Sequence, residues 1–424
     1  MKCYLGEHAV TTFWGLYMEV VYRCCCGIDV HKKVIAACLN NGGKQELREF
    51  GTTTGEIKSL ANWLTDAGCE MTAMESTGVF WKPLYNLFEV MGLDAIIVNA
   101  SHMKALPGRK TDVKDAEWIA NLLRHGLLKA SYIPDREQRE LREIARYRKS
   151  LIEERAREVN RLQKVLEGAN IKLDSVVKNI NGKSARKLLA TIISDEKLDV
   201  DEITGLIHGS MRPKVEQIML SLEGITTSLQ RKLIAQIVDH IDDMTKRISE
   251  MDDLIKGYME QYESAIAAID ELPGIARRSA EVIIAEIGMD MTRFPSAAHL
   301  CSWAGVCPGN NKSAGRRQHG KTTKGNKALK SILTQCAKSA RNVKDSYFSA
   351  QYQRIAARRG KNRATIAVAH SMLIAIYHVL KYGVAFKDLG SDYYDSFNRE
   401  HKIKGYLKRL QALGWSPDLA IVSA

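Results

Sequence analysis

The sequence predicts an α/β domain at the N-terminus, a helical middle region and a mainly helical C-terminal domain. Residues 22–50 alternate between apolar and polar side chains as strands do. Residues 137–258 carry apolar stripes at helical spacing, and further helix-forming segments follow from about residue 271. At 424 residues, the chain has room for two or three domains that each bury a core.

The first domain is predicted over residues 22–132, after an N-terminal extension at residues 1–21. Strands are expected at YRCCCGIDV, at VIAACLN and, after an Asn-Asn-Gly-Gly turn, at KQELREF. There follow a helix from Thr54 to Ala67, the strand EMTAME, the helix WKPLYNLFEVMG, the strand LDAIIVNA and the helix TDVKDAEWIANLLRHG. The order β-β-β-α-β-α-β-α is typical of a mixed α/β domain of the kind found in nucleases. Residues 1–17 differ in character from the rest, and Met18 is an alternative start of translation.

The middle region is predicted over residues 133–265 and consists of long charged helices. The first carries the stripe Leu141, Ile144, Ile152, Val159, Leu162 and Leu166, and the second the stripe Ile241, Met244, Ile248, Met251, Ile255 and Tyr258. Such spacing indicates either a coiled-coil arm that associates with a second chain or the core of a helical bundle within one chain. The C-terminal domain is predicted over residues 266–385, and a tail over residues 386–424.

The charge of the chain indicates a polyanionic partner. The formal net charge is +13, and the stretch from Met291 to Lys344 holds eleven Lys and Arg residues but no Asp or Glu. A solvated basic face is the simpler interpretation of a charge run, but so long a stretch without an acid favours nucleic acid. The nine cysteines contain no CxxC pair and lie mostly in apolar runs, so we expect reduced, buried thiols and a cytoplasmic protein. The uncharged run Ala364–Leu380 is short for a membrane span and predicts a buried helix.

Four carboxylates are candidate metal ligands. Asp29 and Glu75 lie in predicted strands, and Asp112 and Asp115 lie three residues apart on one helix face. Mg²⁺ prefers oxygen ligands, and carboxylates in apolar strands are costly unless they serve a metal or an ion pair. Other roles remain open for the helical acids, because Asp115 could pair with a neighbouring Lys or Arg and Asp112 could cap the helix.

A glycine-rich basic segment around Ser313 holds a candidate nucleophile. Its glycines are expected to prevent a regular element over residues 308–325 and to let the backbone approach a polyanion. Basic residues around Ser313 suit a phosphate group, namely Lys312, Arg316, Arg317, Lys321, Lys324 and Lys327. His319 is a candidate base or a further phosphate contact, and Ser313 itself could merely bind phosphate.

Several of these motifs, in this order, resemble the DEDD-type insertion-sequence transposases. The matching segments are GIDVHKK, MESTG, DVKDAEWIANLLRHGLL, LPGI and FPSAAHLCSWAGVCPGNNKSAGRRQHGKTTKGNKALK. The family is related to the pilin-gene invertase and comprises bridge-RNA-guided recombinases. The resemblance implies a RuvC/RNase H-like N-terminal domain in which Asp29, Glu75, Asp112 and Asp115 bind Mg²⁺. It also implies a coiled-coil dimerisation region and a C-terminal transposase domain, with Ser313 as the catalytic serine that forms a covalent bond to DNA.

The resemblance leads to one functional hypothesis and two alternatives. We expect a Mg²⁺-dependent DNA transposase that mobilises its own insertion sequence without ATP. Its expected partners are donor and target DNA, a non-coding guide RNA from the element and further copies of the chain in a dimer or tetramer. The expected location is the prokaryotic cytoplasm at the nucleoid, with no membrane partner. The alternatives are a RuvC-like structure-selective nuclease, in which Ser313 only binds phosphate, and a non-catalytic nucleic-acid-binding scaffold.

Overall fold

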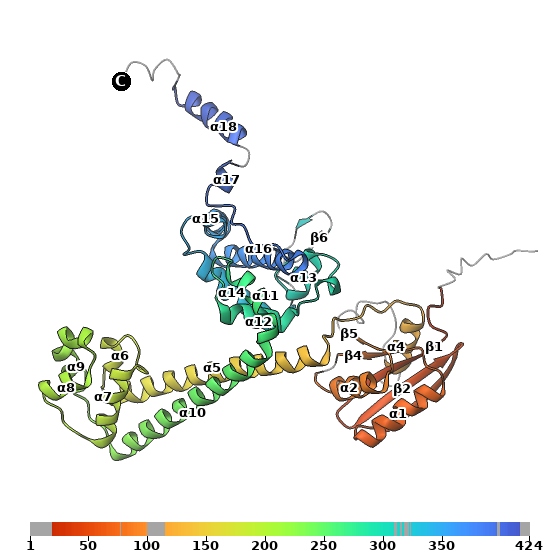
Figure 1. Cartoon of the computed structure of the whole chain (residues 1–424), viewed down its shortest axis with the longest axis horizontal. Coiled ribbons are helices and arrows are strands. Elements are labelled where there is room, and N and C mark those ends of the chain that lie inside the picture. The colour runs from red at the N-terminus through yellow and green to blue at the C-terminus, as the bar shows by residue number, and fades with distance from the viewer. Residues whose placement is uncertain are drawn as a thin grey trace, which may run out of the picture. The chain divides into compact units, whose positions relative to one another are not determined.

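The computed structural model describes residues 19–415 apart from residues 77, 100–114, 309–311, 314–315, 318–321, 323 and 397–398. Figure 1 shows its helices and strands. The chain divides into two compact units, which meet in the sequence at Arg136 and Glu137. The first unit holds a mixed α/β sheet and the second is mostly helical, as the sequence predicts.

The first unit is built on a five-stranded sheet with the order β3-β2-β1-β4-β5. Its strands are β1 (Cys24–Val30), β2 (Val34–Asn41), β3 (Lys44–Gly51), β4 (Met71–Glu75) and β5 (Ala95–Val98). The first three form an antiparallel meander, whereas β4 pairs in parallel with β1 and β5 pairs in parallel with β4. The carboxyl ends of β1, β4 and β5 therefore share one edge of the sheet.

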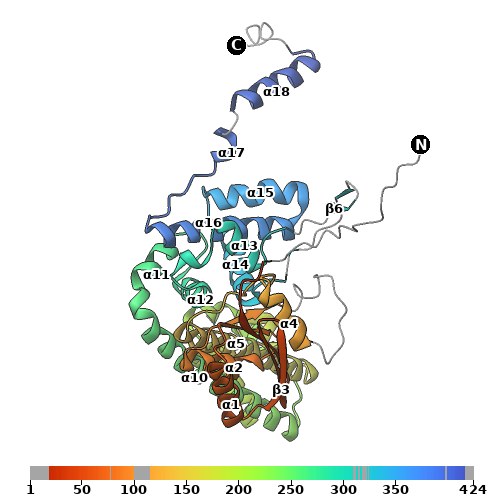
Figure 2. The ribbon, with the colours of Figure 1, turned by 90° about the vertical axis from the view of Figure 1, so that its right-hand side faces the viewer.

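Helices cover both faces of this sheet (Figure 2). Helices α1 (Thr54–Asp66) and α2 (Trp81–Met91) pack on one face, where Leu60, Phe88 and Ile28 belong to one buried cluster. Helix α4 (Asp115–Arg124) packs on the other face, where its Ile119 lies with Cys25 and Ala73. Alternation along each strand separates the two sets of side chains, as a buried strand requires.

Helix α4 approaches β1 at Gly27 as closely as two backbones allow. A Cβ atom at this position would lie 2.2 Å from the amide nitrogen of Ala120 and 2.3 Å from the carbonyl oxygen of Ala116. The small residues Ala116 and Ala120 complete the contact on the helix side. Glycine is therefore needed here for the helix to lie on the strand.

The second unit begins with two long antiparallel helices, α5 (Arg136–Gly168) and α10 (Ser228–Met259). Arg148 pairs with Asp252 and Arg155 with Thr245, which sets the antiparallel direction. Their distal ends share one core with the short helices α6 (Leu173–Val176), α7 (Lys183–Ser194), α8 (Val200–Leu206) and α9 (Val215–Ser221).

The two predicted stripes lie largely in the interior of their own chain. Leu162 and Leu166 of α5 join Ile241 and Met244 of α10 in the distal core. Ile255, nearer the proximal end, is also buried. The stripes thus have partners within one chain, as the bundle interpretation expects, and association with a second chain remains a prediction.

The remaining helices form a compact group around α16 (Lys361–Tyr382), which contacts α11 (Glu263–Asp270), α13 (Ala297–Ala304), α14 (Lys327–Ala340) and α15 (Tyr347–Arg359). Helix α16 is long and apolar enough to cross a membrane by composition, but half of its most apolar stretch is buried among these neighbours. Ala369, Leu373 and Ile376 are fully buried. The prediction of a buried helix at this position is therefore confirmed.

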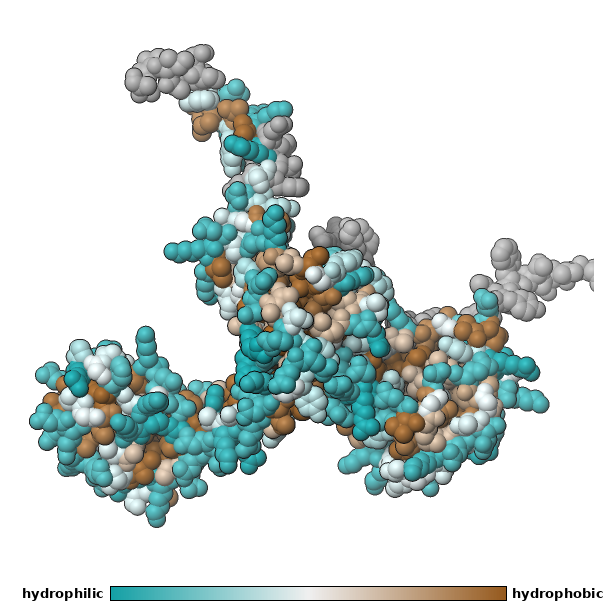
Figure 3. Space-filling view, in the orientation of Figure 1, coloured by the Kyte–Doolittle hydropathy of each residue, from teal (hydrophilic) through white to brown (hydrophobic). Residues whose placement is uncertain are grey.

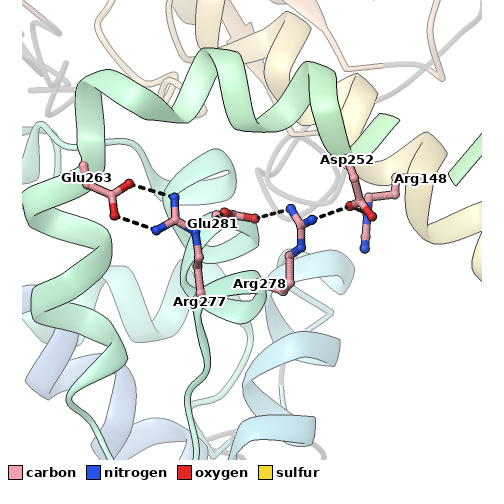
Figure 4. A network of polar contacts seen from close by, with 6 residues as sticks. All are labelled: Arg148, Asp252, Glu263, Arg277, Arg278 and Glu281. Atoms are coloured by element: carbon pink, nitrogen blue, oxygen red, sulfur yellow. Dashed lines mark hydrogen bonds and ion pairs between the residues drawn. The ribbon is translucent and has the colours of Figure 1, made fainter. Parts of the chain in front are cut away.

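A chain of ion pairs joins the long helices to this group (Figure 4). Helix α12 (Arg277–Ile287) places Arg277 and Arg278 on either side of Glu281, whose side chain is only 2% exposed. Arg278 continues to Asp252 of α10, which also pairs with Arg148 of α5. A buried carboxylate is costly unless it is paired, and Glu281 has two guanidinium partners.

The last two helices that the structure describes are α17 (Tyr393–Ser396) and α18 (Arg399–Ala412). Apolar side chains gather on the surface of α18 (Figure 3), among them the exposed Ile403, Leu407 and Leu410.

The contact at Gly27 generates a prediction about stability. Replacement of Gly27 by Ala should destabilise the protein by about 3 kcal/mol, because the methyl group meets backbone atoms that cannot move independently. Gly55→Ala is the control, since an added Cβ at that helical position meets no atom within 4 Å. Thermal unfolding of the two variants should show a lowered transition for Gly27→Ala alone, and equal transitions would refute the close contact.

Candidate functional site

Asp29 and Glu75 lie on adjacent parallel strands at the same edge of the sheet. The register pairs Ile28 with Met74, so Asp29 and Glu75 are the next residues along β1 and β4. Ile28 and Met74 point into the core beneath α1 and α2. Because side chains alternate along a strand, both carboxylates therefore point to the opposite face, which α4 covers.

Helix α4 places a third carboxylate over this edge. Successive residues of β1 contact α4 in reverse order along the helix. The Cys25 thiol lies 3.6 Å from the carbonyl oxygen of Ala120, whereas Gly27, two residues later, lies against both Ala120 and the earlier Ala116. The helix is thus antiparallel to β1 and begins near the end of the strand that carries Asp29. Asp115 opens the helix one turn before Ile119, which packs on the sheet, so Asp115 belongs to the sheet-facing side.

His31 is a neighbour that the sequence analysis did not select. Its Nε2 atom lies 3.1 Å from an Asp29 carboxylate oxygen, while its ring remains 65% exposed. The Asp29 side chain itself is only 12% exposed. The sequence could have indicated this contact, because His31 follows Asp29 by two residues and residues two apart on a strand share a face.

The donor set of this edge suits a hard cation such as Mg²⁺, because all its predicted ligands are carboxylates. Asp112, the fourth predicted ligand, lies outside the described residues. Among the residues that the structure does describe, no group of three or more His, Cys, Asp or Glu side chains is close enough to hold a metal ion. Asp29, Glu75 and Asp115 are therefore brought to one edge and one face of the sheet without closing into a coordination shell.

Ser313 lies in the second unit, on a short antiparallel ladder. Strands β6 (Lys312–Ser313) and β7 (Arg316–Arg317) pair Ser313 with Arg316 and Lys312 with Arg317. The expectation that glycines exclude a regular element from residues 308–325 is therefore wrong. A connection of two residues with a glycine is the spacing of a hairpin, and this local signal outweighs the overall glycine content.

The structure describes only some of the predicted nucleic-acid contacts. Lys324 and Lys327 are exposed and free to meet a ligand from solvent. His319 and Lys321 lie outside the described residues, as do the side chains of Lys312, Ser313, Arg316 and Arg317.

The base of the segment that carries Ser313 is closed by a contact between two glycines. A Cβ atom on Gly325 would lie 2.3 Å from the amide nitrogen of Gly305, and both glycines have positive φ angles. The next residue, Asn326, donates its amide N–H to the carbonyl oxygen of Trp303 at 3.1 Å. Its side-chain oxygen accepts from the amides of Ala328 and Leu329 and so caps α14.

Glu286 ties this base to the long helix α5. Its side chain is 1% exposed and accepts two hydrogen bonds of 2.8 Å from the Arg146 guanidinium. It also accepts a 2.7 Å bond from the Asn326 side chain. Arg142 lies beside it, with Nε 3.6 Å from a carboxylate oxygen and a further bond to the Glu286 carbonyl. The pair with Glu286 raises the pKa of Arg146.

Two family models match separate parts of the chain. Residues 26–171 match the IS110 DEDD model, described as "Transposase", and residues 266–353 match the model described as "Transposase IS116/IS110/IS902 family". These ranges contain the acidic edge and the Ser313 segment respectively.

Two curated proteins are similar over most of the chain. One is an "Insertion element IS110 uncharacterized 43.6 kDa protein" of Streptomyces coelicolor, 27% identical over 312 residues that cover 66% of this chain and 73% of the relative. The other is a "Putative transposase y4qE" of Sinorhizobium fredii, 24% identical over 321 residues that cover 73% and 70%.

The Glu286 cluster generates a second prediction. Glu286→Ala should destabilise the protein by about 3–5 kcal/mol, because it leaves the nearly buried Arg142 without its carboxylate. Glu286→Gln keeps hydrogen-bonding atoms and should cost less. The control is Glu153→Ala, which breaks a pair with Lys149 at a carboxylate that is 59% exposed and should cost less than about 1 kcal/mol. Urea unfolding measures all three, and an equal effect of the two Ala variants would contradict the role of burial.

Proposed function

Because the chain belongs to the IS110 family of transposases, we propose that it mobilises its own insertion sequence by Mg²⁺-dependent, serine-mediated DNA strand exchange. The observation that supports the proposal is that Asp29 and Glu75 end adjacent parallel strands and that α4, which begins with Asp115, packs on the face of the sheet to which they point. An antiparallel meander followed by two parallel strands, with acids at the ends of β1 and β4, is also what a RuvC/RNase H-like domain requires.

The acidic edge is proposed to hold the metal through Asp29, Glu75, Asp112 and Asp115. Bound Mg²⁺ supplies charge stabilisation at the scissile phosphate and orients it. The protein's own contribution is positional. Gly27 allows α4 to lie on β1, so the helical carboxylates can meet the strand carboxylates. His31 holds one oxygen of Asp29 and leaves the other to a ligand.

Ser313 is proposed as the nucleophile. Its Oγ forms a bond to the DNA phosphorus as the bond from phosphorus to one deoxyribose oxygen breaks. The serine gives up its hydroxyl proton, and the departing oxygen takes up a proton to become a free hydroxyl. Attack by a hydroxyl of the second DNA reverses these changes and restores Ser313. Each step exchanges one phosphoester for another, so ATP is not consumed.

The basic residues of the segment are proposed to hold the phosphate during this exchange. Arg316 is the ladder partner of Ser313, and Lys312 and Arg317 form the neighbouring pair. Guanidinium groups bind phosphate oxygens through two parallel hydrogen bonds and stabilise the charge that builds on them. His319, Lys321, Lys324 and Lys327 would extend the contact along the strand.

The partners follow from the same family resemblance. Donor and target DNA are the proposed substrates, and a non-coding RNA of the element is the proposed guide. The chain is proposed to act in the prokaryotic cytoplasm as a dimer or tetramer, in which the acids of one copy meet Ser313 of another. The paired stripes of α5 and α10 bury their own contacts, so we assign self-association to the outer surfaces of these helices.

The experiment separates strand exchange from simple hydrolysis. Purified protein is mixed with Mg²⁺, the end RNA of the element and labelled donor and target DNA, and joined and cleaved products are resolved. Ser313→Ala should abolish both joined and cleaved products, because no covalent intermediate can form. Ser339→Ala is the matched control, since Ser339 is an exposed serine of α14 in the same unit. Cleaved ends that persist in Ser313→Ala would replace the proposal with a nuclease that uses water.

The acidic edge is tested in the same assay. Asp29→Asn should lower the rate of joining by at least about 100-fold, because it removes a metal ligand without changing the shape of the side chain. The control is Asp66→Asn at the exposed end of α1, which should retain the full rate. A rate for Asp29→Asn that matches this control would exclude Asp29 from the chemistry.

A further inference from the structure

The corner between α15 and α16 carries a second, separate group of cations. Gly360 alone joins the two helices, with a φ of +83°, and so turns the chain sharply. Within ten residues on either side of this turn lie five exposed Lys and Arg side chains, namely Arg354, Arg358, Arg359, Lys361 and Arg363. We call this group the basic corner. It lies outside the acid-free stretch on which the nucleic-acid prediction rests.

Within the part of the chain that the structure describes, the basic corner has no acidic partners. Residues 346–387 contain no Asp or Glu, so neither helix supplies a carboxylate. In the described part of the chain, no carboxylate from another element forms an ion pair with any of the five. Arg354 lies over the ring of Tyr394, 5.4 Å from its centre, and leaves the other four facing solvent. Several other arginines of the second unit do pair with acids, among them Arg277 with Glu263 and Arg293 with Asp290.

Helix electrostatics explain only part of this cluster. Arg358 and Arg359 lie in the last turn of α15, where cations stabilise the negative end of the helix dipole. Lys361 and Arg363 lie in the first turn of α16, where the dipole repels cations. That turn has no acidic residue, and its N-cap, Gly360, has no side chain to offer to the first amide groups of the helix. Lys361 and Arg363 therefore do not stabilise α16 in the free protein, whereas a bound anion would interact favourably with both.

We propose that the basic corner is a second nucleic-acid site that grips the phosphate backbone of duplex DNA, apart from the Ser313 segment. That the polyanion is DNA rests on the proposed function. Four of the five residues are Arg, which binds phosphate oxygens bidentately. Arg354 and Arg358 are four residues apart on one face of α15, and Lys361 and Arg363 begin α16 directly after the turn. Charge without base-reading groups gives affinity but no sequence preference.

The test measures binding of the full-length protein to a labelled duplex of random sequence by fluorescence anisotropy. The variant Arg358→Glu/Arg359→Glu/Arg363→Glu should bind at least about 10-fold more weakly. The slope of log K against log salt should fall by about 2 to 3, since each lost phosphate contact removes about 0.9. Arg358→Gln/Arg359→Gln/Arg363→Gln should bind with intermediate affinity. Circular dichroism confirms that the variants fold.

The matched control is Lys178→Glu/Lys183→Glu/Lys187→Glu, which changes the net charge equally at exposed positions of the distal helices. It should retain wild-type affinity and salt slope. Equal losses in both triple variants would mean that net charge alone matters and would overturn the proposal. A loss confined to a structured RNA probe, with duplex binding unchanged, would overturn the assignment to DNA.

The binding experiment distinguishes failure of the basic corner from failure of the proposed function. A wild-type protein that does not bind the duplex at all contradicts the strand-exchange proposal itself. A wild-type protein that binds it, with the corner variant equal to wild type, overturns the basic corner and leaves strand exchange at Ser313 standing.

Discussion

The backbone of α4 rests directly on β1 at Gly27, and this contact sets the position of Asp115 relative to the strand ends that carry Asp29 and Glu75. A helix held at a normal distance by a side chain would carry Asp115 away from the sheet edge that ends in Asp29 and Glu75. The contact requires glycine at position 27, because a Cβ atom there would overlap the backbone of α4. The same glycine interrupts an apolar strand, which would otherwise prefer a larger residue for packing. Packing is therefore lost at one position of β1, and in exchange α4 lies directly on the sheet.

In the second unit, buried ion pairs fix the position of α12 relative to its neighbours. Glu281 and Glu286 both lie on α12, and both are almost completely buried. Each gathers arginines from the helix itself or from α5, and Glu286 also holds the amide of Asn326 at the base of the Ser313 segment. Buried ion pairs add little net stability compared with apolar packing, but they form only when the two side chains have a defined relative position. Through Asn326, the Glu286 pairs fix the residue at which α14 begins after the Ser313 segment.

Much of this arrangement could be predicted from local patterns. Alternation and turn residues located the strands, and hence the ends that carry Asp29 and Glu75. The partners of Glu286 could not be predicted, because it resembles an ordinary helical surface acid and Arg146 is 140 residues away in the sequence. The stripes on α5 and α10 were ambiguous for another reason, since periodicity shows which face is buried but not against which chain. The basic corner could not be predicted as part of the first basic region, because Asp345 separates the two acid-free stretches and only the turn at Gly360 brings the cations of α15 and α16 together.

The central claim is that Ser313 bonds covalently to DNA, and mass spectrometry of the trapped intermediate tests it most directly. The strand-exchange reaction is quenched in denaturant, the DNA is degraded by nuclease, and the protein is digested with trypsin. Cleavage after Lys312 and Arg316 releases the peptide Ser313-Ala314-Gly315-Arg316, in which Ser313 is the one hydroxyl side chain. The account predicts that this peptide carries a nucleotide linked through phosphate. A nucleotide on any other peptide, or an unmodified peptide from a reaction that has produced joined DNA, would contradict it.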